Sequence, residues 1–172
     1  MTNPKQFKSE AIILKIRPLG ERDRLVTFFS PTLGRHSAII KSKSGLEPIS
    51  YHHLVLYKGK SLDLITESQT LSPFAGIRDS FNAMSMAGYF CEVITKATSD
   101  GQENQPLFDI LKASLSQLDN ASPILSVRDQ FHHDVLIAEG LSEQEATCSP
   151  EKFLSQFSEY CGARIRLPVM LS

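Results

Sequence analysis

Residues 11–41, AIILKIRPLGERDRLVTFFSPTLGRHSAIIK, contain three short apolar runs separated by Gly and Pro. The runs at 11–16, 25–30 and 36–41 are rich in β-branched and aromatic residues, and each is followed within a few positions by Pro or Gly. Because Gly and Pro favour turns and interrupt strands, this pattern predicts three β-strands joined by short connections.

Two further strands are predicted over 51–58 and 61–71, where apolar and polar residues alternate on either side of the turn sequence Lys58-Gly59-Lys60. Along 61–71 the alternation places Asp63 and Glu67 on the same face of the strand. Five short strands at this spacing predict a small barrel or sandwich, and five is the strand number of the OB-fold barrel.

From about residue 79 the apolar residues recur every three or four positions, which predicts helices. The buried face of the first helix is expected to carry Phe81, Met84, Ala87, Cys91 and Ile94. Further helices are predicted from Pro106 to Leu118, between Ser122 and Gly140, and between Ser149 and Gly162. The last stretch, 164–171, alternates apolar and basic residues and fits either an edge strand or an extended tail docked on the helices.

The charges divide between the two halves of the chain. Residues 1–80 carry 12 Lys and Arg against 7 Asp and Glu, whereas residues 81–172 carry 6 against 12. A basic half joined to an acidic half is typical of a polyanion-binding domain fused to another kind of domain. We therefore predict an α+β chain: a five-stranded OB-fold barrel over 1–75 that binds nucleic acid, then an all-helical domain over 76–172 for packing and partner contacts.

The composition indicates which broad class of protein this is. Hydrophobic residues make up 41% and charged residues 22%, which is typical of a globular protein. No apolar run approaches the roughly 18 residues of a membrane span, and the first ten residues are polar, so a cytoplasmic location is expected. The three cysteines Cys91, Cys148 and Cys161 show no ligand spacing relative to the five histidines, so neither disulfide, metal nor other cofactor is predicted.

Catalytic signatures are missing from the sequence. There is no GxGxxG, GxxxxGK[ST], HExxH or GxSxG motif. His52-His53 lies in a predicted strand and His132-His133 in a predicted helix, so the two rings of each pair should diverge, with one packed and one facing solvent. The carboxylates of Glu21-Arg22-Asp23-Arg24 alternate with arginines that keep both ionised. We therefore expect no enzyme activity and no catalytic residue.

Basic side chains gather at strand ends and turns of the predicted barrel. The candidate phosphate contacts are Lys15, Arg17, Arg22, Arg24, Arg35, Lys41, Lys43, Lys58 and Lys60. On a small barrel such positions can form a track for a phosphate backbone. Stacking rings are offered by Tyr51, Tyr57, Phe28 and Phe29, of which Tyr57 is the best surface candidate because strand alternation buries about every second residue.

Three segments resemble the RecO family of recombination mediators. Residues 10–30 (EAIILKIRPLGERDRLVTFFS) resemble the family's opening strand, Gly-Glu-x-Asp turn and second strand. Residues 34–41 (GRHSAIIK) are similar to its third strand, and 54–74 (LVLYKGKSLDLITESQTLSPF) to its last hairpin and the exit from the barrel. The similarity is good over about 8–118 and weak over 120–160.

The resemblance implies an OB-fold that binds single- and double-stranded DNA, followed by a helical domain. It implies strand annealing, help in loading recombinase onto DNA coated by single-strand-binding protein, and association with the nucleoid. The implied partners are RecR and the acidic tail of single-strand-binding protein, for which Arg164 and Arg166, flanked by Ile165 and Leu167, form a candidate docking site.

Two departures from the family pattern modify these expectations. Many members carry a four-cysteine zinc module in the helical domain, and this sequence contains no such set, so zinc is not expected. The basic loop after the third strand offers only Lys41 and Lys43, which predicts weaker DNA contact there. The alternatives are an adaptor of RecO descent that binds proteins with little or no DNA binding, and an OB-fold RNA-binding protein.

Overall fold

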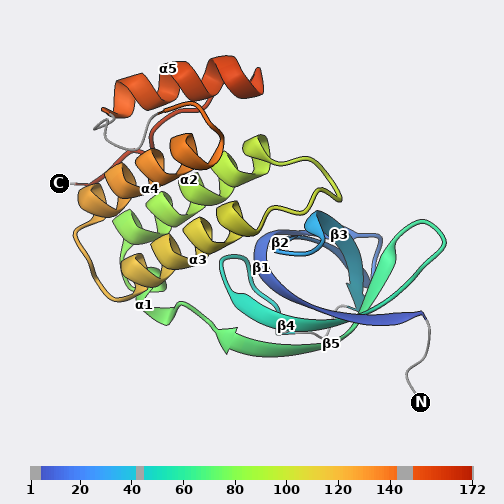
Figure 1. Ribbon diagram of the computed structural model, residues 1–172. Coiled ribbons are helices and arrows are strands. Elements are labelled where there is room, and N and C mark those ends of the chain that lie inside the picture. Colours follow the sequence, from blue (N-terminus) through green and yellow to red (C-terminus); the bar gives the residue numbers. More distant parts are fainter. Residues whose placement is uncertain (1–4, 42–44, 143–148, 172) are drawn as a thin grey trace. The chain divides into compact units, whose positions relative to one another are not determined.

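The computed structural model describes residues 5–41, 45–142 and 149–171. Two compact units make up the chain. One contains the strands up to Pro73 together with the segment Thr98–Gln105, and the other contains Phe74–Ala97 and the residues from Pro106 onward. The first unit is a β-barrel and the second is helical (Figure 1). The segment Thr98–Gln105 lies between two helices in sequence but belongs to the barrel unit.

Five strands close into the predicted barrel. They are β1 (Gln6–Leu19), β2 (Asp23–Ser30), β3 (Gly34–Lys41), β4 (Tyr51–Tyr57) and β5 (Asp63–Ser72), arranged β1-β2-β3-β5-β4 with β4 returning to β1. Neighbouring strands are antiparallel except β3 and β5, which run parallel and share two register pairs, Ala38 with Asp63 and Ile39 with Leu64. This arrangement confirms the OB-fold barrel.

Strand β1 begins five residues before the predicted strand 11–16 and ends three residues after it, so that Pro18 lies within the strand instead of ending it. Pro18 is in register with Arg24 of β2, whereas β4 pairs with β1 only as far as Ile12. Beyond Ile12 one edge of β1 is therefore not paired with β4, and an edge tolerates the missing N–H of proline. The chain turns after Leu19 at Gly20, whose φ of 68° favours glycine.

The barrel interior is filled by side chains that alternate along each strand. The core consists of Ala11, Ile13, Val26, Phe28, Ala38, Ile40, Leu46, Leu54, Leu56 and Ile65. Asp63 is also buried, at 4% exposure, whereas Glu67 is exposed. The expectation that Asp63 and Glu67 share a face is wrong, because a bulge shifts the register between β4 and β5 after Ile65.

The helical unit contains α1 (Ala75–Arg78), α2 (Phe81–Ala97), α3 (Gln105–Asp119), α4 (Ile124–Ala138) and α5 (Pro150–Cys161). Four of these helices were expected, and the short α1 was not. At the start of α5, Ser149 accepts a hydrogen bond from the backbone N–H of Lys152 at 3.3 Å, and Gly162 follows its end with a φ of 62°.

The buried face of α2 differs from the prediction. Ala87, Cys91 and Ile94 are buried as expected, but Phe81 is 60% exposed and Met84 only half-buried. The burial extends instead over Ala83, Met86, Tyr89, Phe90 and Val93. A helix covered on more than one side buries a wider arc than a single stripe of period 3.6 indicates.

The stretch 164–171 is an extended tail, which decides between the two predicted forms. Within it Ile165 is buried. The side chain of Asn82 on α2 donates to the carbonyl of Leu171 at 2.9 Å and accepts from its N–H at 2.8 Å. These two hydrogen bonds dock the tail on the helical unit.

A buried aromatic cluster joins α2, α4 and α5. His132 lies flat on Phe153, with ring centroids 3.9 Å apart and planes 4° from parallel, and its Nε2 is 2.7 Å from the hydroxyl of Tyr89. Burial and the nearby charge of Arg128 lower the pKa of His132 to about 3, so the ring is neutral near pH 7. His133 is half-buried and His52 buried beside exposed His53, so the rings of each pair diverge as predicted.

The neutral state of His132 predicts acid sensitivity of the helical unit. The unfolded chain takes up a proton near pH 6.5 and the folded chain only near 3. The contribution of His132 to folding is therefore full above pH 6.5, and between pH 6.5 and 3 it falls by about 1.4 kcal/mol per pH unit. We expect His132→Phe to flatten this dependence in urea unfolding followed between pH 7 and 4. His133→Phe is the control, and an equal effect of both substitutions would contradict the assignment.

Candidate nucleic-acid interface

The outer face of β1, β2 and β3 carries two cross-strand rows of side chains. The first row is Lys15, Thr27 and Ser37, and the second is Arg17, Leu25 and Ile39. The row between them, which includes the core residues Val26 and Ala38, points into the barrel, so both of these rows point outward. OB-folds bind oligonucleotides on this face and on the adjoining loops.

Hydroxyl groups occupy the middle of this face and cations lie along its β1 side. Thr27 Oγ1 and Ser37 Oγ are 3.2 Å apart and share a hydrogen bond. Lys15 and Arg17 are exposed beside them. Within the described part of the chain neither cation has a carboxylate partner, and the same holds for exposed Arg22 in the β1–β2 turn. This edge of the face is therefore positively charged.

The far end of the face is partly neutralised. Lys41 ends β3 in register with Asp23, and its Nζ lies 3.3 Å from Asp23 Oδ1. Arg24 belongs to an inward-pointing row with Ile40 and is half-buried. Lys43 lies outside the described residues. The strand register thus brings Arg17, Arg24 and Lys41 to one end of the barrel, although Lys41 already has an anionic partner.

Arg35 lies at the opposite end of β3. It shares the outer side of the strand with Lys41, but the two lie six positions apart, or about 20 Å along the strand. Its Nε donates to Asp100 Oδ1 at 2.6 Å, and its carbonyl accepts the N–H of Gly101 at 2.9 Å. Arg35 is therefore part of the contact that holds the segment Thr98–Gln105 on the barrel.

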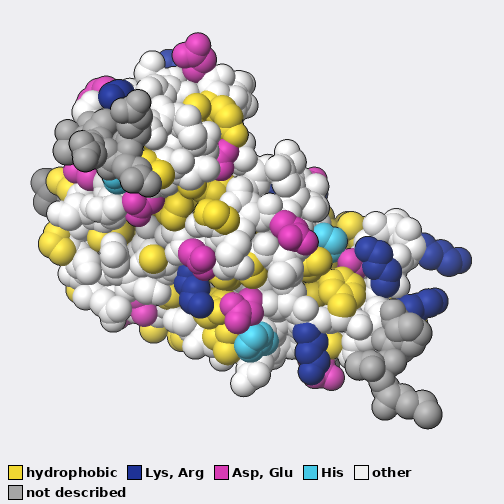
Figure 2. All heavy atoms as spheres, in the orientation of Figure 1, with side chains coloured by type: hydrophobic (Ala, Val, Ile, Leu, Met, Phe, Trp, Pro, Cys, Tyr) yellow, Lys and Arg dark blue, Asp and Glu magenta, His cyan; other side chains and the backbone are white. Residues whose placement is uncertain are grey.

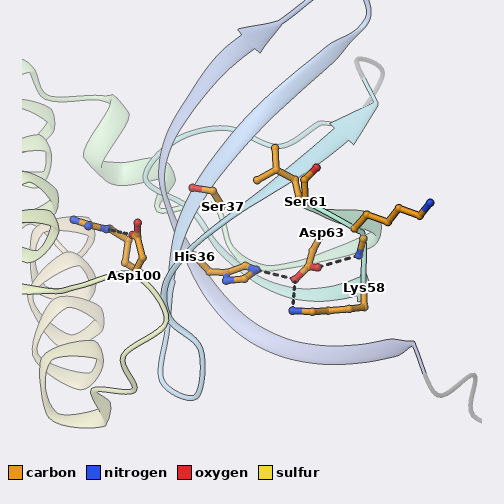
Figure 3. Close-up of a pocket in the computed structure, with 10 residues that line it drawn as sticks. His36, Ser37, Lys58, Ser61, Asp63 and Asp100 are labelled. Carbon is orange, nitrogen blue, oxygen red and sulfur yellow. Dashed lines mark hydrogen bonds and ion pairs between the residues drawn. The ribbon is translucent and has the colours of Figure 1, made fainter.

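The connection between β4 and β5 forms a pocket of about 260 Å³ with the first half of β3 (Figure 3). His36 and Lys58 both point toward Asp63, with His36 Nε2 at 2.9 Å and Lys58 Nζ at 3.7 Å from Asp63 Oδ2. The N–H of Gly59 donates to Asp63 Oδ1 at 3.1 Å. Lys60 is exposed and, among the described residues, has no carboxylate partner.

Asp63 is ionised despite its burial. Burial by itself raises the pKa of the Asp63 carboxyl, but the hydrogen bonds from Gly59 and His36 and the charges of Lys58 and His36 outweigh it and hold that pKa below its usual range. The sequence contains one indication that Asp63 is unusual, because an acidic residue stands on the inward-facing side of a strand with alternating apolar and polar residues. It could not show that His36 would be the partner, because the two are 27 residues apart.

Aromatic side chains contribute little exposed area to this face. Phe28 and Phe29 are fully buried, and buried Tyr51 donates its hydroxyl to Glu10 Oε2 at 2.5 Å. Tyr57 is half-buried and lies in register with Leu64 of β5, which continues the row of Ile39 across the β3–β5 pair. Of the four candidate rings, Tyr57 therefore keeps the most accessible surface.

Lys and Arg side chains gather toward one end of the barrel on the face shown in Figure 2. Acidic side chains are interspersed among them over the remainder of that view. Among the described residues, no group of three or more His, Cys, Asp or Glu side chains lies close enough to hold a metal ion. The same residues contain no helix with the length and apolarity needed to cross a membrane.

Comparisons with known proteins agree with the barrel and the helices. The family described as Recombination protein O N terminal matches residues 1–74, and Recombination protein O C terminal matches residues 78–136. The chain belongs to the RecO family. Its barrel is the N-terminal OB-fold of that family, and α2, α3 and most of α4 lie in the C-terminal RecO match.

Several curated RecO proteins are similar to this chain. The DNA repair protein RecO of Dehalococcoides mccartyi is 32% identical over 157 residues, which is 87% of this chain and 62% of that protein. RecO of Clostridium kluyveri is 38% identical over 116 residues, covering 63% of this chain and 45% of the relative. The chain thus spans about three fifths or less of the length of these RecO proteins. Both relatives are named DNA repair protein RecO.

The contact of Thr98–Gln105 with the barrel depends on a glycine. Gly34 has a φ of 64°, and a Cβ there would lie 1.9 Å from the carbonyl oxygen of Gln102. Gly20 has a φ of 68° with open space around it, so it is a matched control. We expect Gly20→Ala to cost about 1 kcal/mol and Gly34→Ala about 3 kcal/mol in denaturant unfolding, because only the second requires backbone to move. Equal losses would contradict the close approach.

Proposed function

We propose that this RecO-family protein binds single- and double-stranded DNA without sequence preference, anneals complementary strands, and helps load recombinase onto DNA covered by single-strand-binding protein. The observation that supports this most is the pair of exposed cations Lys15 and Arg17 beside the hydroxyls of Thr27 and Ser37. They lie on the face that OB-folds use for oligonucleotides.

The proposed DNA-contacting residues fall into two groups, according to whether a carboxylate already lies beside them. Lys15, Arg17, Arg22 and Lys60 are exposed, and the described residues offer them no carboxylate. Arg35 and Lys41 would exchange a carboxylate for a phosphate, whereas Lys58 is paired with the buried carboxylate of Asp63. Exposed ion pairs contribute only about 0–1 kcal/mol, so a phosphate can compete for Lys41. Arg24, Lys43 and Tyr57 complete the proposed set.

The mechanism is electrostatic and needs no bond to be made or broken. Each Lys or Arg that contacts a phosphate releases condensed counterions, which favours binding at low salt. Two strands whose phosphates are partly neutralised on one basic surface repel each other less, so their bases can pair. Exposed stacking area is confined to Tyr57 among the four candidate rings, which favours contact with the backbone over contact with the bases.

Salt dependence is the measurement that tests DNA binding. We expect labelled single-stranded DNA to bind with log K falling linearly with log salt. Lys15→Gln and Arg17→Gln should each reduce the magnitude of this slope by about 0.7. Lys8→Gln is the matched control, because Lys8 is an exposed lysine of β1 in register with Val55 of β4, away from the β2–β3 face. Absence of binding by the unsubstituted protein would favour a protein-binding adaptor, and equal competition by RNA would favour an RNA-binding role.

Partner binding is proposed for the tail 164–171. Arg164 and Arg166 are exposed there, as are the apolar side chains of Val169 and Leu171. Cations beside exposed apolar groups suit an acidic peptide that also carries hydrophobic residues, such as the tail of single-strand-binding protein. RecR is proposed as a second partner on the family relationship alone.

A labelled peptide from the acidic tail of single-strand-binding protein tests this surface. Replacing both arginines, Arg164→Glu and Arg166→Glu, should weaken binding about tenfold through loss of charge complementarity. Lys152→Glu, an exposed charge reversal on α5, serves as the control in the same fluorescence anisotropy titration. Equal binding by all three proteins would place the peptide elsewhere.

A further inference from the structure

The two lysines of the Lys58-Gly59-Lys60 connection differ in their surroundings. The Nζ of Lys58 lies 3.7 Å from the buried carboxylate of Asp63. Lys60 is exposed and, among the described residues, has no carboxylate within ion-pair distance. Sequence spacing alone would assign both lysines the same role, since they stand on either side of one glycine.

The carboxylate of Asp63 contacts three polar groups, two from the β4–β5 connection and one from β3. Its Oδ1 accepts the N–H of Gly59, and its Oδ2 faces His36 Nε2 and Lys58 Nζ (Figure 3). Gly59 and Lys58 belong to the β4–β5 connection, whereas His36 belongs to β3. A carboxylate that is 4% exposed is stable only when charged or hydrogen-bonding groups surround it in this way.

These contacts lie where β3 meets β5, which is the strand pair of the barrel with the fewest register pairs; we call this pair the β3–β5 seam. The parallel pair β3–β5 has two register pairs, one of which includes Asp63, whereas β2 and β3 have eight. The His36–Asp63 hydrogen bond adds a side-chain contact across the same seam. Asp63 thus acts on the closure of the barrel and on the connection that leads into β5.

The connection itself has little freedom. A Cβ on Gly59 would lie 1.8 Å from the carbonyl oxygen of Leu62, so the chain folds tightly back on itself there. With Gly59 bonded to Asp63 and Lys58 directed toward it, Lys60 is the lysine left on the outside of the turn. The fixed turn determines where that charge is presented.

We propose that Asp63 is the positioning residue of the β4–β5 connection, that Lys58 serves as its counter-ion, and that Lys60 alone of the two lysines contacts phosphate. This inference rests on the proposed DNA binding. Lys58 remains 66% exposed, so its pairing with Asp63, and not burial, is what withholds it from DNA.

Separate neutralisation of the two lysines in the full chain tests the division of roles. Lys60→Gln should reduce the magnitude of the slope of log K against log salt by about 0.7 on single-stranded DNA and leave the melting temperature unchanged. Lys58→Gln should leave the slope unchanged and lower the melting temperature by a few degrees, because Asp63 loses a counter-ion. Equal slope losses in both variants would overturn the proposal while leaving DNA binding intact.

A second test removes the counter-ion role of Lys58 and measures the salt dependence of DNA binding, which would not change if Asp63 had a purely structural role. In Asp63→Asn the amide oxygen can still accept from Gly59, but Lys58 loses its counter-ion and becomes available to phosphate. The slope of log K against log salt should therefore become steeper by about 0.7, and the added substitution Lys58→Gln should return it to the starting value. An unchanged slope in folded Asp63→Asn would overturn the proposal.

The controls separate the two levels of inference. If Asp63→Asn does not fold, the comparison of Lys58→Gln with Lys60→Gln still decides the division of roles. If the unsubstituted protein shows no salt-dependent DNA binding, the proposed function fails and this inference fails with it. If the protein binds DNA but Lys60→Gln has no effect on the slope, only the role of the connection is wrong.

Discussion

Closure of the barrel across β3 and β5 is the constraint on which the rest of the first unit depends. A five-stranded sheet becomes a barrel only if every strand pairs with two neighbours, and β3 and β5 pair over just two register pairs, Ala38 with Asp63 and Ile39 with Leu64. Because this seam is short, the ionised side chain of Asp63 and its partner His36 form part of the closure. Polar groups inside the barrel thereby connect its stability to the shape of the surface loop.

Carboxylates at three places on the barrel shape the electrostatics of its outer surface. Carboxylates accompany Arg35, Lys41 and Lys58, so the number of basic residues in the barrel overstates the charge available to a phosphate backbone. Among the described residues of the barrel, exposed cations without a carboxylate partner lie along β1, in the β1–β2 turn and at Lys60. A modest number of phosphate contacts would make the proposed DNA binding reversible and dependent on salt.

Much of the architecture follows from local sequence. Runs of β-branched residues followed by Gly or Pro predicted three strands, and alternation of apolar and polar residues predicted the other two. The change to a period of 3.6 predicted four of the five helices in the described part of the chain. Local sequence patterns did not predict which side chains are buried where contacts between distant elements determine burial. The bulge after Ile65 changes which side chains share a face, and the burial of α2 extends around more of the helix than its apolar stripe indicates.

The sequence by itself determined the barrel followed by helices, the basic character of the first half and the family, because these depend on residue type and order along the chain. Only the tertiary structure decided which cations stand alone, since pairs such as Arg35–Asp100 and His36–Asp63 join residues 65 and 27 positions apart. It also decided that Phe28 and Phe29 are both buried. Charge pairing and burial are properties of distance in space, and strand spacing does not encode them.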